Sequence, residues 1–79
     1  MPKKIRVGGM PPYIGVTDMN AAFNSYGTIV TSSIDLDAAG QSTGVGHIEY
    51  TTDQAGTNAI AGMNGGTLGG ATIRVTDDT

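Results

Sequence analysis

The sequence predicts an α+β domain in which the elements follow in the order strand, helix, strand, strand, helix, strand. Four short segments alternate apolar and polar residues, two longer segments repeat apolar residues at helical spacing, and Gly-rich or Pro-containing turns separate them. A chain of 79 residues has the size of one small domain, which buries only about 60% of its unfolded surface. We therefore expect a single domain over residues 1–79, with a core over residues 5–75 and short tails at residues 1–3 and 76–79.

The first strand and the first helix are predicted from residues 4–27. Apolar and polar side chains alternate over residues 4–7, and two glycines followed by two prolines end this strand. Thr17 is the expected N-cap of the helix, because its hydroxyl can accept a backbone N–H, and Asp18 suits the positive helix end. Apolar residues then recur at helical spacing until Gly27 stops the helix.

The remaining elements follow the same reasoning. In the second strand, residues 30, 32, 34 and 36 share one face, and a loop over residues 37–42 leads into a strand over residues 43–50, so that the two form a hairpin. Thr52 opens the second helix, and Asn64 with two following glycines closes it. A turn over residues 68–70 leads into the last strand, where apolar residues 73 and 75 alternate with polar ones.

This order of elements predicts a ferredoxin-like βαββαβ fold, because each helix has one apolar stripe to bury. The four strands would form one antiparallel sheet with both helices packed on one face, and the other face would be open to solvent. Alternation along the strands assigns to the open face Lys4, Arg6, Ser33, Asp35, Thr43, Val45, His47, Glu49, Thr72 and Arg74.

Two of the strands resemble the motifs of a known family. The run IRVGGM at residues 5–10 and the run TGVGHIEY at residues 43–50 are similar to the hexamer and octamer motifs of the RNA-recognition motif. The resemblance extends over both helices and the last strand, from Ile5 to Val75. It implies an open sheet face on which aromatic side chains stack on the bases of single-stranded RNA.

The residues that would hold RNA depart from the family pattern. Arg6, Val45 and His47 stand where the family carries stacking aromatics, and Thr43 stands at the basic position of the octamer. A guanidinium or an imidazole is an accepted substitute for an aromatic on an RNA-binding surface. The alternative is that Arg6 and His47 are solvated strand residues, with Arg6 near Glu49 or His47 across the strand pair.

The charge of the chain argues against strong binding to phosphate. Seven acidic residues outnumber four basic ones, for a net charge of −3, whereas phosphate contacts by Lys and Arg supply most of the affinity for nucleic acid. The candidate nucleic-acid residues are accordingly few: Lys4, Arg6, Thr43, Val45, His47 and Arg74.

Our leading hypothesis from the sequence is an artificial or redesigned chain on the backbone of this family. It would fold as a monomer, require no partner and bind little or no RNA. Charged residues make up 14% of the chain against about 25% in globular proteins, and Ala, Asn, Ser and Thr fill the predicted helix surfaces. Two alternatives stay open: a natural divergent domain that binds single-stranded RNA weakly through the open face, and a protein-interaction domain with Tyr13 as an anchor.

An enzyme is not expected from this sequence. The chain has one His and no Cys, and its glycine pairs match neither a phosphate-binding loop nor a dinucleotide-binding motif. We predict no catalytic residue, no cofactor and no metal site. No signal peptide or membrane-spanning run is evident, so we expect no membrane association and assign no compartment.

Overall fold

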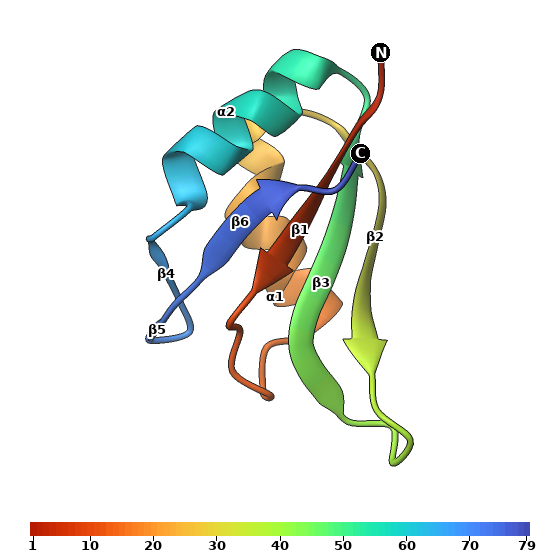
Figure 1. The fold of residues 1–79 in the computed structure, drawn as a ribbon, viewed down its shortest axis with the longest axis vertical. Coiled ribbons are helices and arrows are strands. Elements are labelled where there is room, and N and C mark those ends of the chain that lie inside the picture. The colour runs from red at the N-terminus through yellow and green to blue at the C-terminus, as the bar shows by residue number, and fades with distance from the viewer.

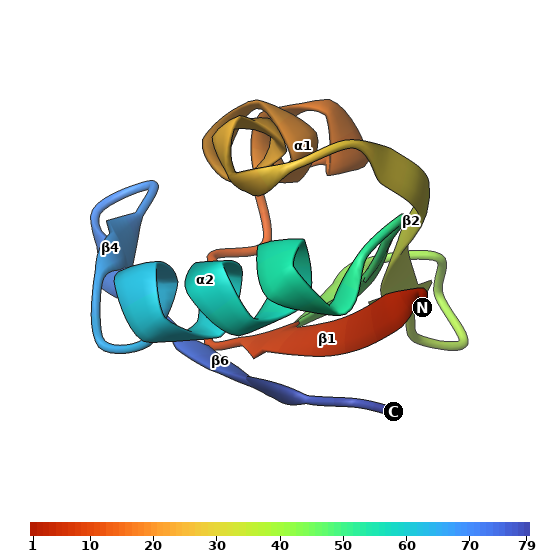
Figure 2. The ribbon, with the colours of Figure 1, turned by 90° about the horizontal axis from the view of Figure 1, so that it is seen from above.

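The computed structural model describes residues 1–79 and contains the predicted sheet and both helices (Figure 1). Strands β2, β3, β1 and β6 lie side by side in that order, and all three strand pairs are antiparallel. Both helices lie on one side of this sheet (Figure 2). The predicted fold class is thereby confirmed. The elements are β1 (Lys3–Gly8), α1 (Val16–Phe23), the 3₁₀ turn η1 (Asn24–Tyr26), β2 (Ile29–Leu36), β3 (Ser42–Tyr50), α2 (Asp53–Met63), β4 (Thr67–Leu68), β5 (Ala71–Thr72) and β6 (Arg74–Asp77).

The core lies between the helices and the covered face of the sheet. Register pairs Ile5 with Ile48 and Val7 with Val75, so the central strands present aligned apolar side chains to the helices. No charged residue is buried. The core consists of twelve apolar or aromatic residues: Ile5, Val7, Met10, Ile14, Met19, Phe23, Ile48, Tyr50, Ala55, Ala59, Ile73 and Val75.

Tyr50 ties the sheet to the end of α1. Its hydroxyl is buried and donates a hydrogen bond of 2.7 Å to the backbone carbonyl of Phe23, which satisfies one of the free carbonyls at a helix C-terminus. Burial raises the pKa of Tyr50 to about 12, because the charged phenolate is disfavoured away from water. The hydroxyl therefore stays a donor at any physiological pH.

The boundaries of α1 differ from the prediction at both ends. The α-helix ends at Phe23, and the 3₁₀ turn η1 covers Asn24–Tyr26 before Gly27. The N-cap of α1 is Gly15 and not Thr17, because the carboxylate of Asp18 accepts the N–H of Gly15 at 3.1 Å and so caps the chain from within the first turn. Thr52 caps α2 as predicted, since its hydroxyl oxygen accepts the N–H of Ala55 at 3.2 Å.

Two glycines inside α2 allow close packing by side chains from elsewhere in the fold. A Cβ placed at Gly56 would overlap the stem of Lys3, and one placed at Gly62 would overlap the hydroxyl of Tyr26. Both glycines lower the helix propensity of α2, but they let Lys3 from β1 and Tyr26 from η1 lie directly against the helix backbone.

Neither helix is long and apolar enough to cross a membrane.

Two features of the strands depart from strict alternation. A register shift between Ile29 and Thr31 makes Val30 an extra residue in β2, so Val30 is 53% exposed instead of sharing the buried face of Ile34. Residues 67–72 form a separate two-stranded hairpin, in which Thr72 pairs with Thr67. Thr72 therefore does not belong to the open face of the main sheet, and the last strand of that sheet begins only at Arg74.

The predicted C-terminal tail is part of the sheet. Asp77 lies in β6 opposite Ile5, and its carboxylate accepts a hydrogen bond of 2.7 Å from the ammonium of Lys3. This contact holds the pKa of Asp77 well below its usual range. The next residue, Asp78, donates its backbone N–H to the carbonyl of Lys4 at 2.9 Å, so the pairing with β1 continues to the end of the chain.

Candidate nucleic-acid interface

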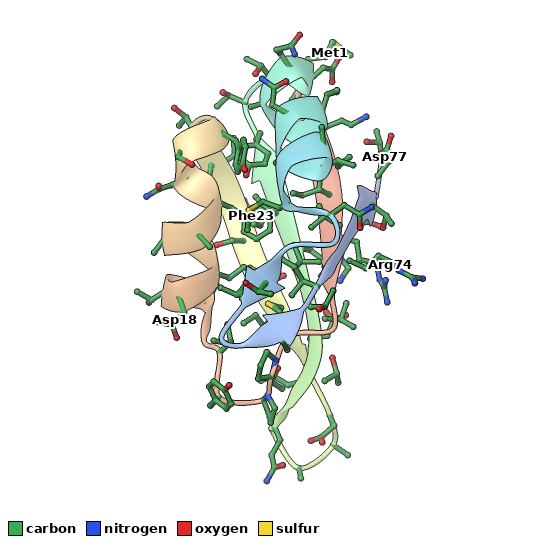
Figure 3. All side chains as sticks on the ribbon, turned by 90° about the vertical axis from the view of Figure 1, so that its left-hand side faces the viewer. Met1, Asp18, Phe23, Arg74 and Asp77 are labelled. Carbon is green, nitrogen blue, oxygen red and sulfur yellow. The ribbon has the colours of Figure 1, made fainter.

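The open face of the sheet carries five of the six predicted site residues in two separate groups. Lys4 and Arg6 come from β1, Val45 and His47 from β3, and Arg74 from β6. Register places Arg6 beside His47 and Gly8 beside Arg74. Figure 3 shows Arg74 projecting from the sheet on the side away from α1 and Phe23 pointing into the core.

The first group surrounds a hollow at the edge of the sheet where β1 ends and β6 begins. We call it the arginine end. Arg6, Val45 and Arg74 line the hollow together with backbone from two glycine-containing turns; the full lining is Arg6, Gly8, Gly9, Val45, Asn64, Gly65, Thr72, Ile73 and Arg74. Both guanidinium groups are unpaired, because the ion pairs of the molecule involve only Lys3 and His47 as cations. Two free guanidinium groups in one hollow suit an anion such as phosphate.

The second group centres on His47, and we call it the histidine end. The Nε2 atom of His47 lies 3.0 Å from an oxygen of Asp35 in β2, and its Nδ1 atom lies 2.8 Å from an oxygen of Asp78. The hydrogen bond with Asp35, followed by that with Asp78, raises the pKa of His47 above 6.5, because each carboxylate stabilises the protonated ring. Lys4 borders the same shallow depression.

Thr43 lies outside both groups. It is at the start of β3 near the loop from β2, and its hydroxyl donates to the backbone carbonyl of Asp35 at 3.0 Å. Of the two cross-strand neighbours expected for Arg6, the structure has His47 and not Glu49. Glu49 instead accepts a long hydrogen bond of 3.5 Å from Thr31 in β2.

Asp78 is the site residue that the sequence analysis missed. The prediction assigns Asp78 to the C-terminal tail, although the sequence contains a pattern that indicates its position on the sheet. Residues 74, 76 and 78 share one parity, so a strand that continues past Val75 puts Asp78 on the same face as Arg74.

Tyr13, the predicted anchor for a protein partner, is tied to a neighbouring loop. The residue is 71% exposed, and its hydroxyl donates to the carbonyl of Gly69 in the turn between β4 and β5. Together with Val16 and Leu36 it borders an apolar groove beside β2. The protein-interaction alternative stays a prediction.

Comparison with known families decides the identity of the fold. The family model described as "RNA recognition motif" matches residues 5–74. The chain belongs to the RNA-recognition-motif family. Membership in this non-enzymatic, RNA-binding family also confirms that the chain is not an enzyme.

Three plant proteins are similar in sequence to this chain. It is 32% identical over 73 residues to glycine-rich RNA-binding protein 3, mitochondrial, of Arabidopsis thaliana, covering 91% of this chain and 24% of that protein. It is 37% identical over 75 residues to small ribosomal subunit protein mS86 of the same plant, covering 94% and 48%. With glycine-rich RNA-binding protein 1 of Sorghum bicolor it shares 40% identity over 60 residues, covering 75% and 42%. The chain thus spans between about a quarter and a half of the length of these relatives.

Solved structures confirm the architecture. A crystal structure of the first two RRM domains of yeast poly(U) binding protein (Pub1) superposes with a TM-score of 0.91 at 22% identity, covering 99% of this chain and 48% of that one. A complex of Sxl-lethal protein with RNA gives a TM-score of 0.88 at 25% identity, covering 94% and 46%. The sequence relatives are natural proteins. Nothing in these comparisons supports an artificial origin, so the natural-domain alternative takes precedence over the design hypothesis.

Proposed function

We propose that this chain is a natural RNA-binding domain that binds single-stranded RNA through the open face of its sheet. The observation that carries the proposal is the arginine end, where two unpaired guanidinium groups line one hollow of that face. The family match supports it, as do the printed names of relatives that are RNA-binding proteins.

The arginine end would hold RNA by a mixture of charge and stacking. The guanidinium of Arg6 lies over Gly8, since a Cβ there would be 3.5 Å from its Nη1 atom, and it occupies the hexamer position at which the family stacks a base. A guanidinium plane stacks on a base and can also bind phosphate. Arg74 would add a second phosphate contact, and Val45 a small apolar surface.

The affinity should be low compared with relatives that carry stacking aromatics. Each base stacked on an aromatic side chain contributes about 1–3 kcal/mol, and the three aromatic positions are here occupied by Arg6, Val45 and His47. The carboxylates of Asp35 and Asp78 at the histidine end oppose phosphate. RNA would therefore contact the arginine end first.

The test is fluorescence anisotropy of a labelled, mixed-sequence RNA of eight nucleotides, measured against salt concentration. Arg6→Ala and Arg74→Ala should each weaken binding and lower the slope of log K against log salt by about 0.7, as expected for one phosphate contact on a single strand. Lys3→Gln is the matched control, because Lys3 has the same charge but pairs with Asp77 outside the open face. The proposal is wrong if the wild type shows no binding at low salt, or if Lys3→Gln weakens binding as much as either arginine variant.

A further inference from the structure

After β6 ends at Asp77, the side chain of Asp78 reaches across the open face. Asp78 pairs with β1 through its backbone, where its N–H donates to Lys4 at 2.9 Å. Strand β1 lies between β6 and β3 in the sheet, yet the Asp78 carboxylate reaches the ring of His47 in β3, at 2.8 Å. Its side chain therefore passes over β1 on the open face of the sheet.

This contact occupies both edges of the His47 ring. Asp35 approaches from β2 on one side and Asp78 from the C-terminal segment on the other, and the side chain of His47 is left 34% exposed. His47 holds an octamer position at which the family carries a stacking aromatic. Both ring nitrogens are bonded to carboxylates, so the polar edges of the ring are occupied and two negative charges lie beside the position at which a base would stack.

We propose that the residues that follow β6, Asp78 and Thr79, form a latch over the histidine end of the RNA-binding face. The Asp35–His47–Asp78 bridge closes this latch, and either RNA or the loss of the His47 proton releases it. The proposal rests on the proposed function, because it assigns a regulation to the same face. It predicts a domain whose accessible RNA site is limited to the arginine end while the latch is closed.

The proton on His47 decides the strength of the bridge. Only the imidazolium can donate from both ring nitrogens, whereas the neutral ring donates from one and presents a lone pair to the other carboxylate. The charged groups that face His47 are Asp35 from β2, Glu49 from its own strand, Arg6 and Lys4 from β1, and Asp78. Three carboxylates against two cations favour the protonated ring, and the raised pKa of His47 agrees with this balance.

The direction of the pH effect follows from this chemistry. Below the pKa of His47 the bridge is complete and the latch is closed, and above it one of the two contacts is lost. A solvated histidine on an RNA-binding face would act in the opposite sense, because its protonation adds a positive charge that attracts phosphate. The latch and the plain electrostatic effect are therefore distinguishable.

The experiment compares Asp78→Asn with Asp53→Asn in the same RNA anisotropy assay at pH 6 and pH 8. Both variants remove one negative charge, but Asp53 lies in the first turn of α2, on the covered side of the sheet. The amide that Asp78→Asn introduces would be a weaker partner for the imidazolium than the carboxylate. We expect Asp78→Asn to bind at least threefold more tightly than Asp53→Asn at pH 6, with a smaller difference at pH 8. Equal affinities for the two variants at pH 6 would overturn the latch.

A second readout separates failure of the latch from failure of the proposed function. The pKa of His47 can be followed by NMR of its ring nitrogens without RNA. Asp78→Asn should lower this pKa and Asp53→Asn should leave it unchanged; an unchanged value in both would overturn the latch even if the wild type binds RNA. If no variant binds RNA, the proposed function fails and the latch fails with it as a regulator, whatever the titration shows.

Discussion

The two faces of the sheet receive alternate residues of the same strands, but they obey different constraints. On β3, Ile48 and Tyr50 are buried against the helices, whereas the alternate residues His47 and Glu49 are partly exposed. The covered face keeps the apolar pattern that the fold requires. The open face has no Phe, Tyr or Trp, so under the proposed function RNA would be held there by charge and by guanidinium stacking. The comparison teaches that the residues required for folding are separate from those to which we assign RNA binding.

The largest expected effect is on the covered face. Phe23→Ala should lower the free energy of unfolding by about 3–5 kcal/mol, because it leaves a cavity at a fully buried position. Urea denaturation measures this loss. The matched variant on the open face is Val45→Ala, for which we expect a loss of about 1 kcal/mol or less. Similar losses in the two variants would show that the two faces are not energetically distinct.

An aromatic returned to the open face should restore affinity without changing stability. Val45→Phe puts a ring at one of the octamer positions where the family stacks a base, and one stacked base contributes about 1–3 kcal/mol. This corresponds to about fivefold to 150-fold in Kd, measured by RNA anisotropy. Thr57→Phe, on the exposed surface of α2, is the control. Equal gains from both variants would mean that the open face is not the binding surface.

A smaller loss is expected from removal of the buried hydroxyl on the covered face. Tyr50→Phe leaves the carbonyl of Phe23 without its partner, which should lower the free energy of unfolding by about 1–3 kcal/mol. Tyr13→Phe removes an exposed hydroxyl that bonds Gly69 and should change stability by less than about 0.5 kcal/mol. Thermal denaturation of the two variants side by side decides the matter. A larger effect of Tyr13→Phe would contradict the assignment of the core.

The smallest effect concerns the histidine end and depends on pH. Because the pKa of His47 is raised in the folded state above its ordinary 6.5, its contribution to stability is complete below that pH. The contribution is lost as the pH rises through the folded pKa. The melting temperature of the wild type, relative to that of His47→Gln, should therefore fall between about pH 6 and pH 8. A difference that rises or stays constant over this range would show that the carboxylates do not stabilise the protonated ring.

Most of the fold follows from alternation and capping in the sequence. The alternating residues 4–7 and 43–50 specify the two central strands, and Thr52 specifies the start of α2. Val30 could not be placed in the same way, because a bulge changes which face a residue occupies without changing the local pattern. The hairpin of β4 and β5 was not predicted, because each of its strands has only two residues and so shows no alternation.

The candidate site was predictable in part. Parity placed Arg6, Val45 and His47 on one face, and the structure brings Arg6, Val45 and Arg74 to one hollow. The bridge through His47 was not predictable, because it depends on the reach of the Asp78 side chain over β1. Such a contact between residues 31 positions apart leaves no local pattern in the sequence.

The most direct test of the central claim is an NMR titration of the ¹⁵N-labelled protein with a mixed pool of short single-stranded RNA at low salt, where weak electrostatic binding is most visible. Binding on the open face should shift backbone amides of β1, β3 and β6, with the largest changes near Arg6 and Arg74. Amides of α1 and α2 should not move. A dispersed spectrum that stays unchanged, or changes confined to the helices, would contradict RNA binding on the open face.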